Sequence, residues 1–103
     1  MVESISIYKL KNLKNINIID IRSIEKYNNR HISGAINIPL DKLLINFNKY
    51  LSKSSKYYIY CQMGVQSRKM CQILKNSGYN VIFLLKCLTM EFFMGIIMLK
   101  GSE

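Results

Sequence analysis

The segment with the clearest capacity for chemistry begins at Cys61, which follows directly on the short apolar run 57–60. A short run rich in Tyr and Ile predicts a buried strand, and the residues from 67 to 77 have the apolar spacing of a helix. A cysteine between a strand and a helix lies where backbone N–H groups converge and where the helix dipole is positive. Both effects favour the thiolate, which is the nucleophilic form of the side chain. Cys61 is therefore the candidate catalytic residue.

The elements that must position Cys61 alternate between strand and helix patterns along the chain. Ser23 is the expected N-cap of a short helix, and Gly78 is placed to end the helix that follows Cys61. The expected strands cover residues 5–8, 16–21, 35–38, 57–60 and 81–85. The expected helices cover residues 23–27, 40–51, 67–77 and 89–99. This alternation predicts the α/β class, with a small, open, mostly parallel sheet that helices flank on both faces.

The carboxyl ends of the strands are where such a sheet forms its reactive crevice. Cys61 is expected at the end of one strand and Asp20 at the end of another. Asp20 and Arg22 are spaced to pair near this crevice. A buried pair of this kind holds the geometry of the neighbouring loops more reliably than it adds stability.

Length and composition narrow the class of protein. At 103 residues the chain is predicted to be one domain, 1–103, and half of its residues are apolar, as in a globular protein. The net charge is +9, but the lysines are scattered and no nucleic-acid-binding signature accompanies them, so we expect no nucleic-acid partner. The uninterrupted apolar stretch 92–99 is too short to cross a bilayer, so we expect no membrane partner.

The cysteines bear on the redox setting. The chain has three cysteines, Cys61, Cys71 and Cys87. Their odd number and irregular spacing argue against a disulfide framework. No secretory leader is visible at the N-terminus, so we expect a cytoplasmic location, where thiols stay reduced. Cys71 is expected to pack in the core, with a resolving thiol for Cys61 as the alternative. Cys87 is expected to fill the core or a loop, with a position near the crevice as the alternative.

Two blocks of the sequence resemble the rhodanese family, in particular its small single-domain thiosulfate sulfurtransferases. The first block runs from Asp20 to Pro39. It is similar to three successive motifs of the family, which are D-x-R, a stretch with an acidic residue and a tyrosine, and H-I-x-G-A-x-N-I-P. The residues that carry it are Asp20, Arg22, Glu25, Tyr27 and the segment 31–39. The second block has Cys61, Gly64 and Ser67 where the family's active-site loop reads C-x-x-G-x-R-S. The resemblance covers residues 5–85 and implies a rhodanese-like fold.

The resemblance implies sulfur transfer by double displacement. Cys61 attacks the outer sulfur of a donor such as thiosulfate, becomes a persulfide, and passes the sulfur to cyanide or to a thiol, including a protein thiol. The implied partners are thus a small sulfur-containing anion and a thiophilic acceptor, with no metal or cofactor. Amide N–H groups of residues 62–67 are expected to point inward and hold an anionic sulfur. The expected substrate-binding residues are Asp20, Arg22, Gln62, Met63, Gly64, Val65, Gln66, Ser67 and Arg68.

The sequence also departs from the family pattern. Many family loops carry Arg one and five residues after the cysteine, where this chain has Gln62 and Gln66. The segment 86–103 lacks the Gly-Gly pair and the Trp that family members tend to show after the last strand. These departures motivate an alternative function, a low-turnover rhodanese-like sulfur-relay or protein-binding module. A cysteine phosphatase is disfavoured, because such enzymes place Arg six residues after the nucleophile, where this chain has Ser67.

The chain has a single histidine, His31. Histidine is a common general base, because its charge changes near neutral pH. The resemblance instead implies a structural histidine that forms a hydrogen bond with the backbone.

Overall fold

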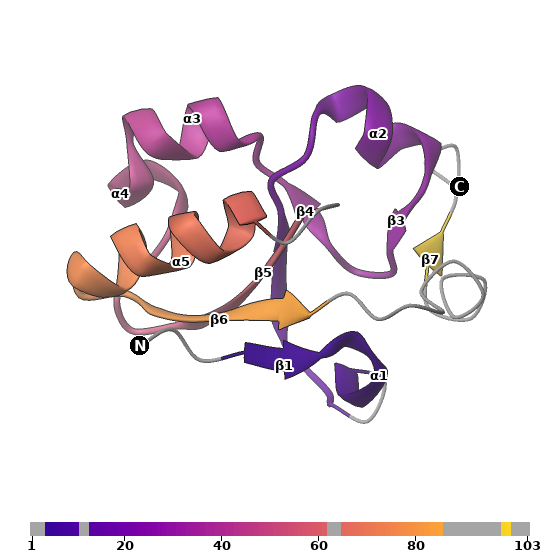
Figure 1. The fold of residues 1–103 in the computed structure, drawn as a ribbon, viewed down its shortest axis with the longest axis horizontal. Helices are drawn as coiled ribbons and strands as arrows, with labels where there is room; N and C mark the ends of the chain where they lie inside the picture. The colour runs from indigo at the N-terminus through magenta and orange to yellow at the C-terminus, as the bar shows by residue number, and fades with distance from the viewer. Residues whose placement is uncertain (1–3, 11–12, 62–64, 86–97, 100–103) are drawn as a thin grey trace.

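The computed structural model describes residues 4–10, 13–61, 65–85 and 98–99 (Figure 1). Its centre is a five-stranded sheet in the order β1-β6-β5-β2-β4, in which every neighbouring pair is parallel. The sheet is open, with β1 and β4 as its edges. Its strands are β1 (Ser4–Ser6), β2 (Asn17–Asp20), β4 (Ile36–Asn37), β5 (Lys56–Tyr60) and β6 (Asn80–Leu85). The predicted α/β class with an open parallel sheet is confirmed.

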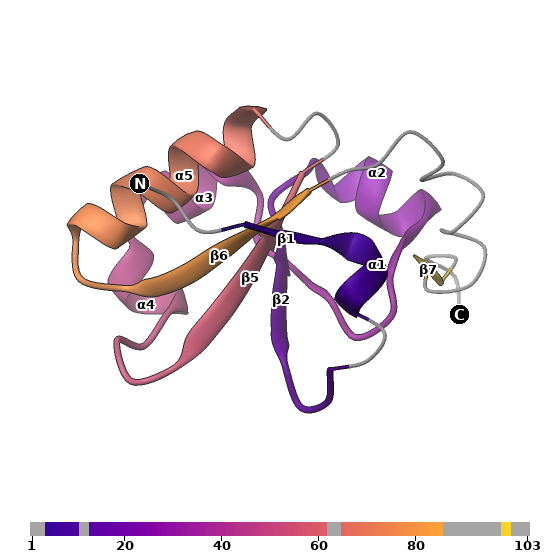
Figure 2. The same cartoon turned by 60° about the horizontal axis from the view of Figure 1, so that its bottom comes forward.

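Helices cover both faces of this sheet, as the sequence predicted. The helices are α1 (Ile7–Leu10), α2 (Ile24–Asn29), α3 (Leu40–Ile45), α4 (Phe47–Tyr50) and α5 (Val65–Asn76). Figures 1 and 2 show α3, α4 and α5 gathered on one face, whereas α1 lies on the other. The second face is also covered by α2, through Tyr27. Within the described part of the chain, no helix is long and apolar enough to span a membrane.

The strand β5 shows why the central strands have almost unbroken apolar sequences. Tyr57 and Ile59 belong to the core cluster beneath α3, α4 and α5, whereas Tyr58 and Tyr60 belong to the cluster on the opposite face. Parallel sheets of this kind are buried on both faces, and all four side chains are at most 8% exposed. Burying a side chain of this size stabilises the fold by about 1.5–3 kcal/mol. Burial thus fixes the register that places Asp20 beside Tyr60 at the ends of β2 and β5.

Two helix ends follow the signals in the sequence. Ser23 caps α2 as predicted, and its hydroxyl accepts a hydrogen bond from the N–H of Lys26 at 3.4 Å. Gly78 follows α5 with a φ of 94°, a left-handed conformation that favours glycine. Its N–H donates to the carbonyl oxygen of Lys75 at 3.1 Å, which closes the helix as predicted.

The predicted elements 5–8 and 40–51 were wrong in part. The predicted strand 5–8 ends at Ser6, and Ile7 begins α1, which brings Leu10 into the core cluster of the second face. The predicted helix 40–51 breaks at Asn46 into α3 and α4, with φ −156° and ψ 81° at that residue. An Asn side chain competes for backbone hydrogen bonds, so the residue is weak in a helix interior.

A second sheet was not predicted. Its strands β3 (His31–Ile32) and β7 (Met98–Leu99) pair antiparallel. Each has only two residues, too few for an alternating pattern to show in the sequence. Because β7 occupies the end of the predicted helix 89–99, that prediction is wrong at its last two residues. Residues 89–97 lie outside the described part of the chain. The predicted strand 35–38 is shortened to the two residues of β4.

Candidate active site

Cys61 lies between the end of β5 at Tyr60 and the start of α5 at Val65. Its side chain is 5% exposed. The backbone N–H of Ser67, in the first turn of α5, donates a hydrogen bond to Cys61 Sγ with an N–S distance of 3.1 Å. An N–H donor at the positive end of a helix stabilises negative charge on the sulfur. The turn can therefore hold an anionic sulfur.

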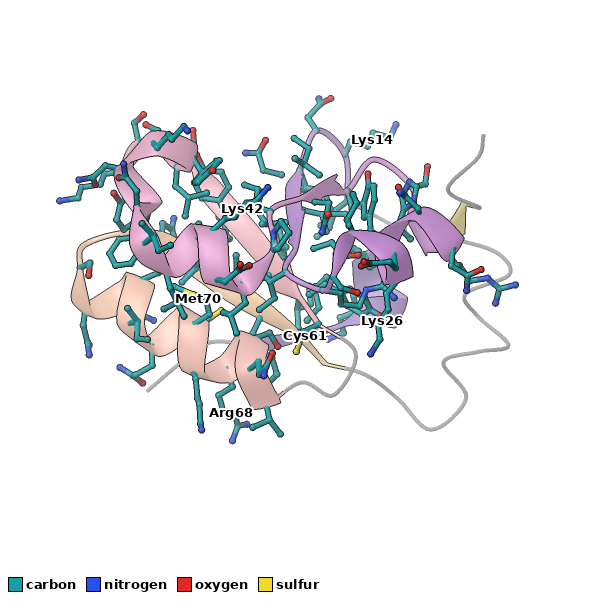
Figure 3. All side chains as sticks on the ribbon, turned by 90° about the horizontal axis from the view of Figure 1, so that it is seen from above. Lys14, Lys26, Lys42, Cys61, Arg68 and Met70 are labelled. Carbon is teal, nitrogen blue, oxygen red and sulfur yellow. The ribbon has the colours of Figure 1, made fainter. Side chains whose placement is uncertain are left out.

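Cys61 also lines a pocket of about 670 Å³, a size suited to a small molecule. Its wall comes from three segments, which are the turn from β2 to α2, the start of α3, and the turn from β5 to α5. The lining residues are Ile21, Arg22, Ser23, Lys26, Pro39, Leu40, Asp41, Cys61, Val65 and Gln66. Figure 3 shows Cys61 between the helices that contribute this wall. The pocket thus lies at the carboxyl ends of neighbouring parallel strands, where the sequence placed the crevice.

Asp20 and Arg22 form the ion pair that the sequence predicted. The Asp20 carboxylate is fully buried and accepts hydrogen bonds from Nη2 (2.8 Å), from Nε (3.0 and 3.1 Å) and from the backbone N–H (3.0 Å) of Arg22. Nη2 also donates to the carbonyl oxygen of Arg30 at 2.6 Å, and the guanidinium lies 5.2 Å from the ring centre of Tyr60. Burial opposes the charge on Arg22, but the hydrogen bonds and charge of Asp20 outweigh it and raise the pKa of Arg22. Arg22 is therefore a fixed part of the wall.

Hydrogen bonds to backbone carbonyl oxygens join this pair to the rest of the site. Asn37 donates from Nδ2 to the carbonyl oxygens of Asp20 (2.9 Å) and Arg22 (3.0 Å). The N–H of Ile21 donates to the carbonyl oxygen of Tyr60 at 3.0 Å, and that of Leu40 donates to Ile21 at 3.1 Å. The ends of β2 and β5 and the start of α3 are thus held in one arrangement.

His31 is structural, as the sequence predicted. Its Nδ1 lies 2.8 Å from the carbonyl oxygen of Tyr27, and the two rings stack with centres 3.9 Å apart. The hydroxyl of Tyr27 in turn donates to the carbonyl oxygen of Ala35. These contacts fix the segment between α2 and β4, and His31 is not part of the pocket wall.

The expected substrate-binding residues divide into three groups. Arg22, Val65 and Gln66 line the pocket with Cys61. Asp20 lies behind Arg22, and Ser67 reaches the sulfur through its backbone N–H. Arg68 is exposed, and its guanidinium lies 5.1 Å from the ring centre of Phe83 rather than in the pocket wall. Three of the expected residues, Gln62, Met63 and Gly64, lie outside the described residues. The amides of residues 62–67 were expected to point towards the sulfur, and the structure describes this contact for the N–H of Ser67.

Two charged residues of the wall were missed by the sequence reasoning. Lys26 lies on α2, and Asp41 lies in the first turn of α3. A signal for both was present in the sequence. Helices that begin just after the carboxyl end of a parallel strand face the crevice with their first turns, so charged residues there are candidates.

The second cysteine in the described chain, Cys71, packs in the core as expected. Its side chain is completely buried beneath α5. Burial raises the pKa of Cys71 to about 12, and the charge of Cys61 adds a smaller increase. The charge of Lys75 lowers this pKa by less than the other two causes raise it. Its thiol therefore stays protonated at neutral pH. Cys87 lies outside the described residues. Among the described residues, no three His, Cys, Asp or Glu side chains are grouped as metal ligands would be.

Comparison with known proteins agrees with this geometry. The family model described as the rhodanese-like domain matches residues 6–87. The putative sulfur carrier protein YrkF of Bacillus subtilis is 31% identical over 74 residues, which are 72% of this chain and 40% of that protein. The thiosulfate sulfurtransferase PspE of Escherichia coli is 37% identical over 63 residues, which are 60% of this chain and 61% of PspE. The chain thus spans about half the length of these relatives.

The fold has similar solved structures as well. The crystal structure of a rhodanese-like domain protein from Staphylococcus aureus superimposes with a TM-score of 0.71 at 30% identity. The matched region covers 79% of this chain and 82% of that protein. The resemblance to the rhodanese family seen in the sequence is confirmed.

Proposed function

Because the chain belongs to the rhodanese-like domain family, we propose that it is a sulfurtransferase in which Cys61 carries a sulfane sulfur as a persulfide. Its relatives at modest identity include a putative sulfur carrier and thiosulfate sulfurtransferases. The observation that carries the proposal is the hydrogen bond from the N–H of Ser67 to Cys61 Sγ, in the wall of a pocket of small-molecule size. This arrangement suits a sulfur that must hold negative charge and still meet a small substrate.

The proposed reaction has two half-reactions. In the first, the Cys61 thiolate attacks the outer sulfur of thiosulfate, a new S–S bond forms, and the S–S bond of thiosulfate breaks with its electron pair leaving on sulfite. In the second, an acceptor such as cyanide attacks the terminal sulfur of the persulfide, and thiocyanate leaves while Cys61 returns to the thiolate. Neither half-reaction needs a net proton or an outside oxidant. Covalent catalysis of this kind replaces one difficult step by two easier ones.

The residues around Cys61 have supporting roles in this proposal. The N–H of Ser67 stabilises the sulfur charge, and a preorganised donor of this kind contributes on the order of 2.7–4 kcal/mol where charge develops. Arg22, held by Asp20, keeps the opposite wall in place. Val65 and Gln66 give the Cys61 side of the wall a neutral surface. We propose that the donor is a small sulfur-containing anion and that the acceptor is cyanide or a thiol, including a protein thiol.

A sulfur relay with little turnover of free thiosulfate is the second candidate. It is favoured by Gln66, an uncharged residue in the wall where many family loops have Arg, and by the similarity to a putative sulfur carrier. In this role Cys61 still forms the persulfide, but a protein thiol accepts the sulfur. For either role we propose a cytoplasmic setting, where reducing conditions keep the Cys61 thiol reduced.

The test is turnover of thiosulfate and cyanide to thiocyanate by the wild type, by Cys61→Ser and by Cys71→Ala as the matched control. We expect Cys61→Ser to abolish turnover and Cys71→Ala to retain it. Thiocyanate formation that survives in Cys61→Ser excludes the proposal. A wild type that takes up one sulfur on Cys61 but turns over slowly indicates the relay.

A further inference from the structure

The charges in the pocket wall are few. Among the described lining residues, Arg22, Lys26 and Asp41 are the ones with ionisable charges besides Cys61. Arg22 is already neutralised by Asp20, and its Nε and Nη2 groups donate to that carboxylate and to a backbone carbonyl. Its side chain is only 9% exposed. An anion that enters the pocket therefore finds in Arg22 a cation that is largely engaged elsewhere.

Lys26 differs from Arg22 in this respect. It lies on α2, lines the same pocket, and is exposed. Within the described part of the chain, no carboxylate lies at ion-pair distance from its Nζ. In Figure 3 the side chain of Lys26 comes from α2, whereas that of Cys61 comes from the end of β5. Lys26 is thus the cation of the wall that a small anion can engage.

Asp41 acts in the opposite direction. It lies in the first turn of α3 and is exposed on the same pocket. Its carboxylate repels an anion, and the repulsion grows with the charge of that anion. Two unit charges about 4 Å apart in water interact by about 1 kcal/mol, which changes an equilibrium or rate constant by about fivefold. The single charges of Lys26 and Asp41 can therefore change the binding of an anion by a measurable factor.

We propose that Lys26 and Asp41 set the charge preference of the Cys61 pocket, with Lys26 binding the anionic end of the donor and Asp41 disfavouring a second negative charge. This inference rests on the proposed function, which it deepens by naming the donor class. A singly charged sulfane donor, such as an alkyl thiosulfonate anion, suits this balance better than the doubly charged thiosulfate. The loop glutamines make no charge contribution, so the selectivity comes from α2 and α3.

The first experiment measures the pocket charge without any sulfur transfer. Cys61 is alkylated with anionic iodoacetate and with neutral iodoacetamide, and the modified peptide is followed by mass spectrometry. The readout is the ratio of the two rate constants. We expect Lys26→Gln to lower this ratio about threefold to fivefold and Asp41→Asn to raise it by a similar factor. Lys14→Gln, which removes the same charge before the amino end of β2, should leave the ratio within about 1.5-fold. An unchanged ratio in both Lys26→Gln and Asp41→Asn overturns the proposal.

The second experiment measures kcat/KM for thiosulfate and for methanethiosulfonate anion in the same variants. We expect Lys26→Gln to lower kcat/KM for the doubly charged thiosulfate about 25-fold and for the monoanion about fivefold. Asp41→Asn should raise the value for thiosulfate more than that for the monoanion. Equal effects of each substitution on the two donors contradict the proposed selectivity. If alkylation ratios shift but no donor is turned over by any form, the charge site stands and the proposed sulfurtransferase function fails.

Discussion

The two walls of the pocket are built in different ways. At the end of β5, the wall contains Cys61, whose sulfur accepts a hydrogen bond from the N–H of Ser67, and the uncharged side chains of Val65 and Gln66. At the end of β2, the wall carries charge, with Arg22 in a buried ion pair and Lys26 exposed. The first wall thus provides the candidate nucleophile, and the second provides charge.

This difference explains how a site can work with glutamines in its loop. The N–H groups at the start of a helix stabilise charge on the sulfur whatever the neighbouring side chains are, because they belong to the backbone. Attraction of an anionic substrate needs a side-chain charge, and in this chain that charge lies across the pocket. Reactivity at Cys61 and recognition of charge are therefore separable by substitution.

The largest effect is expected from Asp20→Asn. The substitution leaves Arg22 with a buried charge that has lost its partner, and breaking a buried pair in this way costs about 3–5 kcal/mol of the free energy of unfolding. Urea denaturation measures it. Asp41→Asn is the matched control, since it removes the same charge from an exposed position and should change stability by about 0.5 kcal/mol or less. Equal effects of the two substitutions contradict a structural role for the Asp20–Arg22 pair.

An effect that is intermediate per pH unit is expected at alkaline pH, on the β5 side. Burial raises the pKa of Cys71 and of Tyr60 to about 12 each, from ordinary values of 9.0 and 10.0. The unfolded chain therefore releases these protons at lower pH than the folded chain does. The free energy of unfolding should fall as pH rises from about 9 towards 12, by up to about 1.4 kcal/mol per pH unit for each group.

The control for this prediction is Cys71→Ala, which removes one of the two groups. Urea denaturation at a series of pH values should show a shallower alkaline decline in this variant than in the wild type. The onset should also move from about pH 9 towards about pH 10, because Tyr60 is the member of this pair that remains. Identical slopes in the two proteins show that burial of the Cys71 thiol does not control alkaline stability.

The smallest effect is expected from Ser23→Ala. Loss of the N-cap of α2 costs about 1 kcal/mol in general, and less here because the capping hydrogen bond is long at 3.4 Å. Since α2 carries Lys26, the substitution should also weaken the preference of Cys61 for anionic reagents while its rate with iodoacetamide stays the same. Ser23→Thr retains a hydroxyl and should restore both properties. A change in the iodoacetamide rate itself indicates that the two walls are not independent.

Much of the fold could be predicted because its signals are local. The run 57–60 is apolar on both faces of a strand, and Ser23 and Gly78 mark helix ends by their own chemistry. The place of Cys61 follows from the strand that precedes it. The pairing of β3 with β7 could not be predicted, since it joins residues far apart in the chain and each strand has only two residues.

The candidate site was predicted less completely, because the direction of a side chain depends on packing. Arg68 is next to Ser67 in the sequence, but successive residues of a helix point about 100° apart, and Arg68 lies over Phe83. Lys26 enters the pocket wall only because α2 packs beside the end of β2. The sequence alone therefore identified the candidate nucleophile and the ion pair but not the charges that face them.

The most direct test of the account is the intact mass of the protein after treatment with thiosulfate and removal of excess reagent. The account predicts that the wild type gains the mass of one sulfur atom, that the sulfur maps to the peptide of Cys61, and that cyanide removes it. Cys71→Ala should gain the same sulfur, and Cys61→Ser should gain none. A wild type that reacts with iodoacetamide at Cys61 but takes up no sulfur there, or a Cys61→Ser variant that still takes it up, would contradict the account.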